Sequence, residues 1–380
     1  MRILKLLVLL LPLCLYACRE DEYVTYMTDE DTGAAPDDRT PYAGLYILNE
    51  GNMGANRCTL DYLDLRGTDS TIHYYRNIYA ERNPSAVKEL GDVGNDIGIY
   101  GSKLWIAVNC SNKVEVCDAR TAKRLGQVNI DNCRYLAFDG GFAYVSSYAG
   151  PVQVSDNCPL GRVYKVDTLT LQKVDSVVVG YQPEEMAVMD GKLYVANSGG
   201  YRVPIYDNRI MVIDLATFKV ISEIEVDVNL HRLLADAHGQ LWVSTRGNYY
   251  DTAPALYCLK EDKVVARLEI PISSMTIAGD SLYYIGTTFS YADGGYRKDF
   301  GIVDVSLQRC SVAVLFETPE VMNITMPYGI IVNPQDRDFY ILDAKNYVSS
   351  GELLHFDADG NFLWRVQTGD IPSRGVFLSP

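Results

Sequence analysis

The chain has 380 residues, and 49 Asp and Glu against 34 Lys and Arg give it a formal net charge of −15 at pH 7. A surface this acidic repels polyanions, so nucleic acid is excluded as an expected partner. The cysteine spacings contain no C-x-x-C pair, which argues against a cysteine-based metal site. An odd number of cysteines follows Cys18, so at least one thiol stays unpaired, and we expect most to be isolated and buried.

The N-terminus carries the pattern of a bacterial lipoprotein signal. Arg2 and Lys5 precede a short apolar run over residues 6–13, and Ala17 stands directly before Cys18. This pattern predicts a signal peptide over residues 1–17 and a lipid on Cys18. The apolar run is too short to cross a bilayer as a mature helix. The alternative is an ordinary cleaved secretory peptide with no lipid.

Residues 18–41 are rich in Asp, Thr, Pro and Gly and contain little to bury, which predicts a flexible lipidated tether. Arg19 is followed by the acidic residues Glu20, Asp21 and Glu22. This short motif resembles the signal that exports lipoproteins of some gut Gram-negative bacteria to the outer face of the outer membrane. The resemblance implies a lipid-anchored protein exposed on the cell surface. The alternative is a solvated run of charges.

A strand of aromatic and β-branched residues recurs along the rest of the chain at intervals of 38 to 59 residues. Most copies follow a tight turn such as Asp190-Gly191, and no helical periodicity interrupts them. Repeats of this length built from short strands are typical of propeller blades. The seven copies are 45–49, 104–109, 142–146, 193–197, 241–245, 282–286 and 339–343.

Further strands surround these copies. Segments that end in Asp, such as 114–118, 163–167, 210–214 and 301–304, predict third strands. Residues 220–226 alternate apolar and polar side chains, as a half-exposed fourth strand does, and residues 186–189 predict an innermost strand. Each copy is therefore expected to form a blade of four strands.

Ring closure is expected to use the C-terminus. No innermost strand precedes Leu45, whereas residues 374–378 form a strand without a partner of their own. Pairing these two segments closes the ring and leaves no sheet edge exposed. The sequence therefore predicts an all-β fold, a seven-bladed β-propeller of four-stranded blades over residues 42–380, closed by its C-terminal strand.

Two motifs resemble known families. Residues 194–197 (Tyr-Val-Ala-Asn) and 213–217 (Ile-Asp-Leu-Ala-Thr) resemble the YVTN-repeat, YncE-like propellers. Residues 46–52 (Tyr-Ile-Leu-Asn-Glu-Gly-Asn) behind a lipidated N-terminus are similar to surface lipoproteins of the BtuG type. The resemblance implies capture of cobalamin and its transfer to a TonB-dependent outer-membrane transporter, but no family binding motif matches residue by residue.

The expected binding face is the one where the connections between blades meet those between second and third strands. Amides pair with amides, Arg donates to a phosphate, and Tyr offers stiff apolar area with a polar tip, so these residue types suit a large, nearly neutral ligand such as a corrinoid. The alternative is a turn role for each Asn and strand packing for many Tyr. The candidate ligand-binding residues are Asn49, Asn52, Asn95, Asp96, Asn109, Arg134, Tyr135, Tyr148, Asn197, His231, Arg232, Arg246, Tyr249, Tyr328, Asp343, Tyr347 and Arg374.

Metal and cofactor chemistry has weaker support. His231 could coordinate the cobalt of a corrinoid, although a lone histidine is more often structural. Glu184, Glu185 and Asp96 could hold Ca²⁺ as in propeller lactonases. We expect these carboxylates to pair instead with the nearby arginines Arg134, Arg232 and Arg374, so we predict no metal and no cofactor besides the ligand.

No sialidase box, Gly-x-Ser-x-Gly elbow or histidine cluster occurs in the sequence, which favours binding over catalysis. Three functions remain open at this point. They are capture of cobalamin or a related corrinoid, binding of a glycan or another surface nutrient, and a metal-dependent lactonase or lyase activity.

Overall fold

The computed structural model describes residues 27–36, 40–68, 70–86, 89–290, 295–306, 312–314 and 318–380. The predicted signal peptide, Cys18 and the tether residues before Met27 lie outside the described residues, so these expectations stay predictions. No helix in the described part of the chain is long and apolar enough to cross a membrane.

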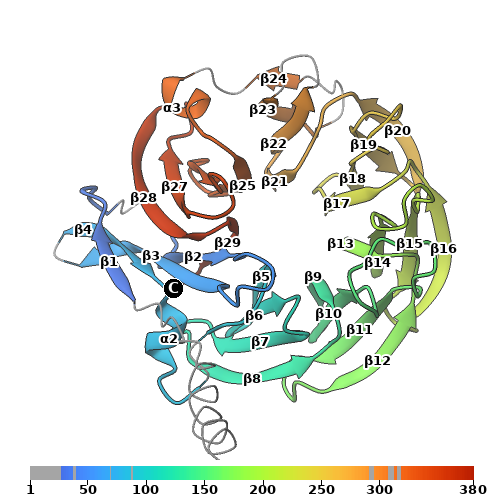
Figure 1. Cartoon of the computed structure of the whole chain (residues 1–380), viewed down its shortest axis with the longest axis horizontal. Helices are drawn as coiled ribbons and strands as arrows, with labels where there is room; N and C mark the ends of the chain where they lie inside the picture. The colour runs from blue at the N-terminus through green and yellow to red at the C-terminus, as the bar shows by residue number, and fades with distance from the viewer. Residues whose placement is uncertain are drawn as a thin grey trace, which may run out of the picture.

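Seven antiparallel sheets stand in a ring, which confirms the predicted seven-bladed propeller (Figure 1). From blade 1 to blade 7 the innermost strands are β29 (Pro372–Leu378), β5 (Gly94–Tyr100), β9 (Cys133–Asp139), β13 (Pro183–Met189), β17 (Leu230–Ala235), β21 (Ser274–Ala278) and β25 (Pro327–Val332). The second strands are β2 (Gly44–Asn49), β6 (Lys103–Val108), β10 (Phe142–Ser147), β14 (Lys192–Asn197), β18 (Gln240–Thr245), β22 (Ser281–Ser290) and β26 (Phe339–Asp343).

The third strands are β3 (Thr59–Thr68), β7 (Lys113–Asp118), β11 (Arg162–Asp167), β15 (Arg209–Asp214), β19 (Ala255–Lys260), β23 (Gly295–Asp304) and β27 (Ser350–Phe356). The fourth strands are β4 (Thr71–Arg76), β8 (Arg124–Asn129), β12 (Lys173–Val178), β16 (Lys219–Glu225), β20 (Lys263–Leu268), β24 (Val312–Val314) and β28 (Phe362–Asp370). Two short helices, α2 (Ile78–Arg82) and α3 (Pro319–Met322), lie in the connections after blades 1 and 6.

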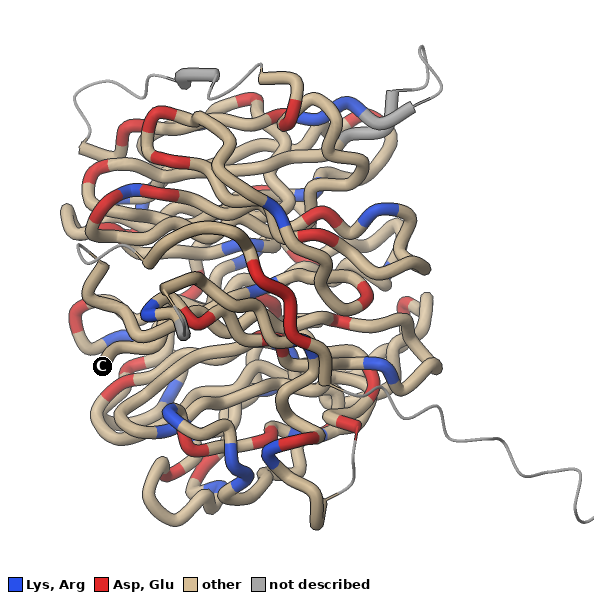
Figure 2. Tube along the Cα trace, turned by 90° about the vertical axis from the view of Figure 1, so that its left-hand side faces the viewer, with Lys and Arg blue, Asp and Glu red and all other residues tan. Residues whose placement is uncertain are grey.

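The core is divided among seven clusters of buried apolar side chains, one between each pair of neighbouring blades. Trp105 of β6, for example, shares a cluster with Val145 of β10, and Trp242 of β18 shares one with Tyr284 of β22. The recurring aromatic and β-branched second strands are therefore buried on both faces, as their composition predicts. Most side chains of outer strands such as β16 are exposed to solvent. Figure 2 shows acidic and basic residues interspersed along the side of the ring.

The C-terminal strand closes the ring as predicted. β29 pairs with β2, with Leu45 opposite Phe377 and Leu48 opposite Arg374. At Gly375 an added Cβ would lie 2.9 Å from the backbone oxygen of Tyr46 as well as against the tip of Ile331, so glycine suits the close approach of β29 to β2 there. The innermost strands on both sides, β25 and β5, pack against β29 (Figure 1).

Blade 1 contains a fifth strand that the sequence analysis did not anticipate. β1 (Thr28–Asp31) pairs with the outer edge of β4, with Thr28 opposite Arg76 and Asp31 opposite His73. This part of the predicted flexible tether therefore belongs to the propeller sheet, because backbone pairing with a free edge compensates for its lack of apolar residues. Its acidic side chains then face the solvent edge, where charge discourages pairing with another chain.

A β-bulge recurs where the innermost strand begins in six of the described blades. Each bulge leaves one extra residue on the innermost strand and redirects side chains at that end. Only in blade 6 does this pairing, between β21 and β22, run without a shift. The residues in the bulges, which we expected in loops between blades, are Ser373, Asn95, Arg134, Tyr135, Glu184, Glu185, His231, Arg232 and Tyr328.

Candidate functional site

The bulge residues meet at one end of the central channel, around a cavity of about 220 Å³. We call this end the channel mouth. The residues that line its cavity are Glu50, Asn95, Arg134, Tyr135, His231, Arg232, Arg246, Ser273, Tyr328, Ser373 and Arg374. The bulges explain this convergence, because each redirects polar side chains that a regular strand would alternate between its two faces.

Glu184 anchors one half of the channel mouth and is almost fully buried. Its carboxylate lies 3.3 Å from Arg134 and 3.4 Å from Arg246, and it accepts a 2.6 Å hydrogen bond from the Tyr148 hydroxyl. Burial by itself would raise the pKa of Glu184, but the two arginines outweigh it and hold the pKa below its ordinary value. Two guanidinium groups thus share one carboxylate, which leaves an excess of positive charge here.

Glu185 and Asp96 form the other half with Arg374 of the closing strand. Arg374 lies 2.9 Å from Glu185 and 3.7 Å from Asp96. The backbone N–H groups of Leu233 and Leu136 donate to Glu185 and Asp96 respectively, each at 2.9 Å. Burial, together with the charge of Glu185, raises the pKa of Asp96 to about 7.

The expected pairing of these carboxylates with arginines is therefore confirmed for Arg134 and Arg374, and Arg246 joins them, whereas Arg232 donates to the Ser273 carbonyl and the Tyr135 hydroxyl. Since the carboxylate oxygens are engaged by arginines and backbone N–H groups, they are not free to surround a cation. Within the described ranges no group of three or more His, Cys, Asp or Glu side chains is placed to hold a metal ion.

Tyr135 stands at the centre of this network. The guanidinium groups of Arg374, Arg232 and Arg134 lie 5.3, 5.6 and 5.8 Å from the centre of its ring, close enough for cation–π attraction. Burial raises the pKa of the Tyr135 phenol, so it stays protonated. Its oxygen accepts from Arg232 at 3.2 Å, which leaves its own hydrogen for Nε2 of His231 at 3.3 Å.

His231 is 7% exposed, and its Nδ1 has no hydrogen-bond partner among the described residues. Burial and then the nearby arginines lower the pKa of His231 well below its ordinary value, so the imidazole is neutral. Because Nε2 accepts from Tyr135, the ring hydrogen belongs on Nδ1. His231 therefore offers an unused N–H donor, which suits a hydrogen-bond acceptor on a ligand better than a cobalt ion.

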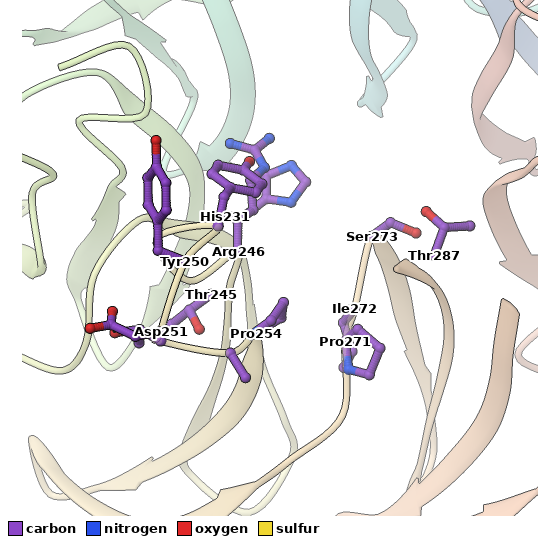
Figure 3. A pocket seen from close by; sticks show the side chains of 13 residues that line it. His231, Thr245, Arg246, Tyr250, Asp251, Pro254, Pro271, Ile272, Ser273 and Thr287 are labelled. Atoms are coloured by element: carbon purple, nitrogen blue, oxygen red, sulfur yellow. The ribbon is translucent and has the colours of Figure 1, made fainter. Parts of the chain in front are cut away.

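A larger pocket of about 560 Å³ adjoins the channel mouth and shares His231, Arg246 and Ser273 with it. It opens between blades 5 and 6, where β17 and β21 pack less closely than other neighbouring innermost strands. Figure 3 shows His231 and Arg246 on one side of the pocket and Pro271, Ile272, Ser273 and Thr287 across from them. We call it the inter-blade pocket. Its remaining lining residues are Thr245, Tyr249, Tyr250, Asp251, Thr252, Ala253 and Pro254.

The structure separates the predicted ligand-binding residues into two groups. Those that line the channel mouth or the inter-blade pocket are Asn95, Arg134, Tyr135, His231, Arg232, Arg246, Tyr249, Tyr328 and Arg374. Asp96 and Tyr148 lie directly behind them, and Tyr347 contacts Tyr328 with ring centres 5.6 Å apart.

The other asparagines and Asp343 line neither cavity. Asn49 donates to Thr59, Asn109 to the Cys133 carbonyl, and Asn197 to the Val195 and Arg209 carbonyls. Asp343 accepts from three backbone N–H groups, those of Thr325, Met326 and Lys345. Asn52 is half-buried in the connection after β2, where its carbonyl accepts from Ala55. These residues hold connections in place, the turn role that was the alternative for each Asn.

Several lining residues were not among the residues predicted to bind the ligand. Glu50 follows the first aromatic strand directly, and its hydrogen bond with Tyr328 places it at the channel mouth, where burial raises its pKa. Pro271 and Ile272 stand in an unremarkable connection between blades. The sequence could have indicated Glu50, because it directly follows a predicted second strand. For the apolar residues of the pocket, the sequence shows only that they lie between two blades.

Solved structures with the same architecture support the fold. The Quinonprotein alcohol dehydrogenase-like protein from Bacteroides thetaiotaomicron is 14% identical, with a TM-score of 0.58 over 90% of this chain and 79% of its own. Hydrazine synthase from Kuenenia stuttgartiensis is 18% identical, with a TM-score of 0.59 over 70% of this chain and 84% of its own. The WD40 domain of Pan2 from Neurospora crassa is 12% identical, with a TM-score of 0.52 over 74% of this chain and 79% of its own. Identities this low show the fold alone.

No curated protein matches the sequence. The finer resemblance to YncE-like and BtuG-type proteins therefore stays a prediction. A family model described as a domain of unknown function, DUF5074, matches residues 43–361, which span nearly all of the ring, and the chain belongs to that family.

Proposed function

We propose that this protein captures a corrinoid such as cobalamin at the channel mouth and the adjoining pocket. We further propose that it is anchored to the outer membrane through a lipid on Cys18, faces the cell exterior, and passes its ligand to a TonB-dependent transporter. The observation that carries the proposal is the pairing of charges at the channel mouth, where the buried carboxylates Glu184, Glu185 and Asp96 are paired with arginines of other blades around the Tyr135 ring.

A preformed network of this kind suits a large ligand with little net charge. The buried carboxylates are already paired with arginines, so they do not require a cation from the ligand. The arginines in turn do not form a free basic cluster that would attract a polyanion. A corrinoid is a flat ring with several amide arms and a single phosphate, which matches this balance. The carboxylate pairing also disfavours the metal-dependent lactonase alternative.

Unused donors at the channel mouth favour a ligand rich in acceptors. His231 Nδ1 and Arg134 Nε are buried and have no hydrogen-bond partner among the described residues. A buried donor without an acceptor costs about 1–3 kcal/mol. The carbonyl oxygens of amide arms can satisfy such donors, so binding relieves a cost present in the empty protein.

Isothermal titration of micromolar protein with cobalamin tests the proposal. We expect heat from binding at one site, and raising the salt about tenfold should barely weaken the affinity because few counterions are released. No heat with cobalamin would overturn corrinoid capture. Heat with a polyanionic glycan that falls steeply with salt would instead favour a glycan-binding protein.

Paired variants locate the binding face. Truncating Arg134 and Tyr135 to Ala together should weaken binding by about 2 kcal/mol or more, because buried aromatic and Arg anchors dominate binding energy. Glu223 and Glu225 on the outer strand β16 provide the matched control, and changing both to Ala should leave binding unchanged. Equal losses in the two double variants would overturn the proposed face. Circular dichroism of both double variants separates lost binding from lost folding.

The anchoring is tested by Cys18→Ala, which should release the protein from isolated membranes into the soluble fraction. Unchanged fractionation of this variant would overturn the lipoprotein proposal without bearing on the ligand.

A further inference from the structure

The inter-blade pocket has a composition that the channel mouth lacks. Its lining away from the channel is mainly apolar or aromatic, with Pro254, Pro271, Ile272, Tyr249 and Tyr250. Tyr249 and Tyr250 are 65% and 84% exposed, so their rings stand at its solvent side as free stacking surfaces. A volume of about 560 Å³ falls in the range that holds a ligand of drug size, smaller than a whole corrinoid.

On its channel side the same pocket is lined by His231 and Arg246, while the carboxylate of Asp251 in its lining accepts from the amide of Asn248 in the outer loop (Figure 3). Nδ1 of His231 is buried and has no hydrogen-bond partner among the described residues, and the guanidinium of Arg246 uses one nitrogen on Glu184 while its side chain stays 30% exposed. Burial would lower the pKa of Arg246, but Glu184 and other neighbours raise it, so the guanidinium keeps its charge. Because Glu184 is shared with Arg134, its single negative charge does not neutralise both arginines.

A flat apolar cleft that ends in an arginine and a neutral imidazole N–H matches a heteroaromatic base joined to a phosphate. We propose that the inter-blade pocket is a subsite for this nucleotide-like group, with the base between the tyrosines and the Pro271–Ile272 wall and the phosphate at Arg246 and His231. The inference rests on the proposed function, because in a cobalamin-type ligand this group is the nucleotide tail below the corrin ring. A free nucleotide carries the same chemistry and is the other possible source.

The pocket lies beside the start of blade 6. There the innermost strand begins at Ser274 without a register shift, and the N–H of Ser273 before it donates to the Ile285 carbonyl. The residues that do stand there, Pro271, Ile272 and Ser273, carry short or rigid side chains.

Three probes and two variants test the subsite. The probes are cobalamin, cobinamide, which has the same ring without the nucleotide tail, and adenosine monophosphate as a free nucleotide. The wild-type protein should bind cobalamin at least about tenfold more tightly than cobinamide. Arg246→Met should bring the ratio of the affinities for cobalamin and cobinamide to about one, because only cobalamin carries the phosphate that Arg246 would bind, while Glu184 keeps Arg134 and Tyr148 as partners.

Tyr250→Ala changes an exposed side chain that the fold does not need, so it keeps the test valid if Arg246→Met fails to fold. Tyr250→Ala should reduce the ratio of the affinities for cobalamin and cobinamide about threefold or more. Arg209→Met is the matched control, because Arg209 pairs with Asp207 and Glu223 on blade 4 and lines neither cavity. This variant should keep the wild-type ratio of the affinities for cobalamin and cobinamide.

The outcomes separate the two proposals. Equal wild-type affinities for cobalamin and cobinamide, or a difference that survives in both Arg246→Met and Tyr250→Ala, would overturn the subsite while leaving corrinoid capture intact. Failure of both corrinoids to bind would overturn the proposed function. Binding of adenosine monophosphate that disappears in Arg246→Met would then still support the assigned chemistry of the pocket.

Discussion

Carboxylates occupy opposite ends of the blades and behave in opposite ways. At one end, Asp118, Asp167 and Asp214 close the third strands of blades 2, 3 and 4. Each accepts hydrogen bonds from the backbone N–H and the hydroxyl of the threonine three residues later, at 2.7 to 2.9 Å. These bonds to the charged form lower the pKa of all three aspartates. We call this end the turn end.

At the channel mouth the same chemical group is buried among charges from other blades. Burial raises the pKa of Asp96 and of Glu185, and only Glu184, with two arginines, keeps a lowered pKa. The turn end therefore uses ionised carboxylates to fix local structure, whereas the channel mouth holds carboxylates at a cost in stability. A costly arrangement that recurs where β-bulges converge indicates a functional surface.

The largest expected effect comes from removing the strand that joins both ends. Deleting residues 372–380 removes the partner of β2 and also removes Arg374 from the channel mouth. We expect the deleted protein to lose its cooperative thermal unfolding transition, because the deletion exposes the inner edge of β2 and the core beside β29. Arg374→Ala, which keeps the strand, should retain that transition. An unchanged melting temperature in the deletion would mean that the ring closes in another way.

Glu184→Ala should have the next largest effect. It leaves Arg134 and Arg246 without their shared carboxylate in a buried site, and breaking a buried ion pair costs about 3–5 kcal/mol. Urea unfolding of the variant measures this loss in the free energy of unfolding. Asp167→Ala at the turn end is the matched comparison and should lose clearly less. Equal losses would show that the two ends do not differ in the way described.

The two ends should also respond oppositely to pH. The pKa of Asp96 is about 7 in the folded protein, above its value of about 4 in an unfolded chain, so the folded state binds more protons between these values. The contribution of Asp96 to stability is complete below about pH 4 and is lost as pH rises through 7, by at most about 1.4 kcal/mol per pH unit. The turn aspartates, with lowered pKa values, contribute above about pH 4 and lose that contribution as pH falls.

Asp96→Asn should therefore flatten the decline in the free energy of unfolding between about pH 5 and 7, measured by urea unfolding at each pH. Asp118→Asn should leave that decline in place and instead reduce the loss of stability in acid. A pH profile of Asp96→Asn that runs parallel to that of the wild type from pH 5 to 7 would contradict the assignment of a raised pKa to Asp96.

The smallest effect belongs to the outer strands. Glu223→Ala breaks an ion pair with Arg209 in which the glutamate side chain is 52% exposed. Exposed pairs contribute little, so the free energy of unfolding should stay within about 0.5 kcal/mol of the wild-type value. A loss of stability as large as that of Glu184→Ala would mean that the outer strands and the channel mouth do not differ in this way.

The sequence by itself determined the repeat and therefore the fold. The aromatic second strands, the Asp-ended third strands and the unpartnered C-terminal strand are local patterns of alternation and turn residues, and these are visible without long-range contacts. The same patterns located the face where Arg134, Tyr135, His231 and Arg232 converge. They also indicated that the carboxylates there would pair with arginines.

Only the tertiary structure decided which candidates form the site. A β-bulge is a single extra residue on a strand, and it leaves no mark in a pattern of alternation, so the redirection of Tyr135 and Glu184 into the channel mouth was invisible. The asparagines could not be sorted because a turn role and a binding role require the same amide. The inter-blade pocket is lined by residues of blades 5 and 6, and the channel mouth brings together His231 and Tyr135, which are 96 residues apart in the sequence. Contacts between such distant residues follow from the closure of the ring, not from any local pattern.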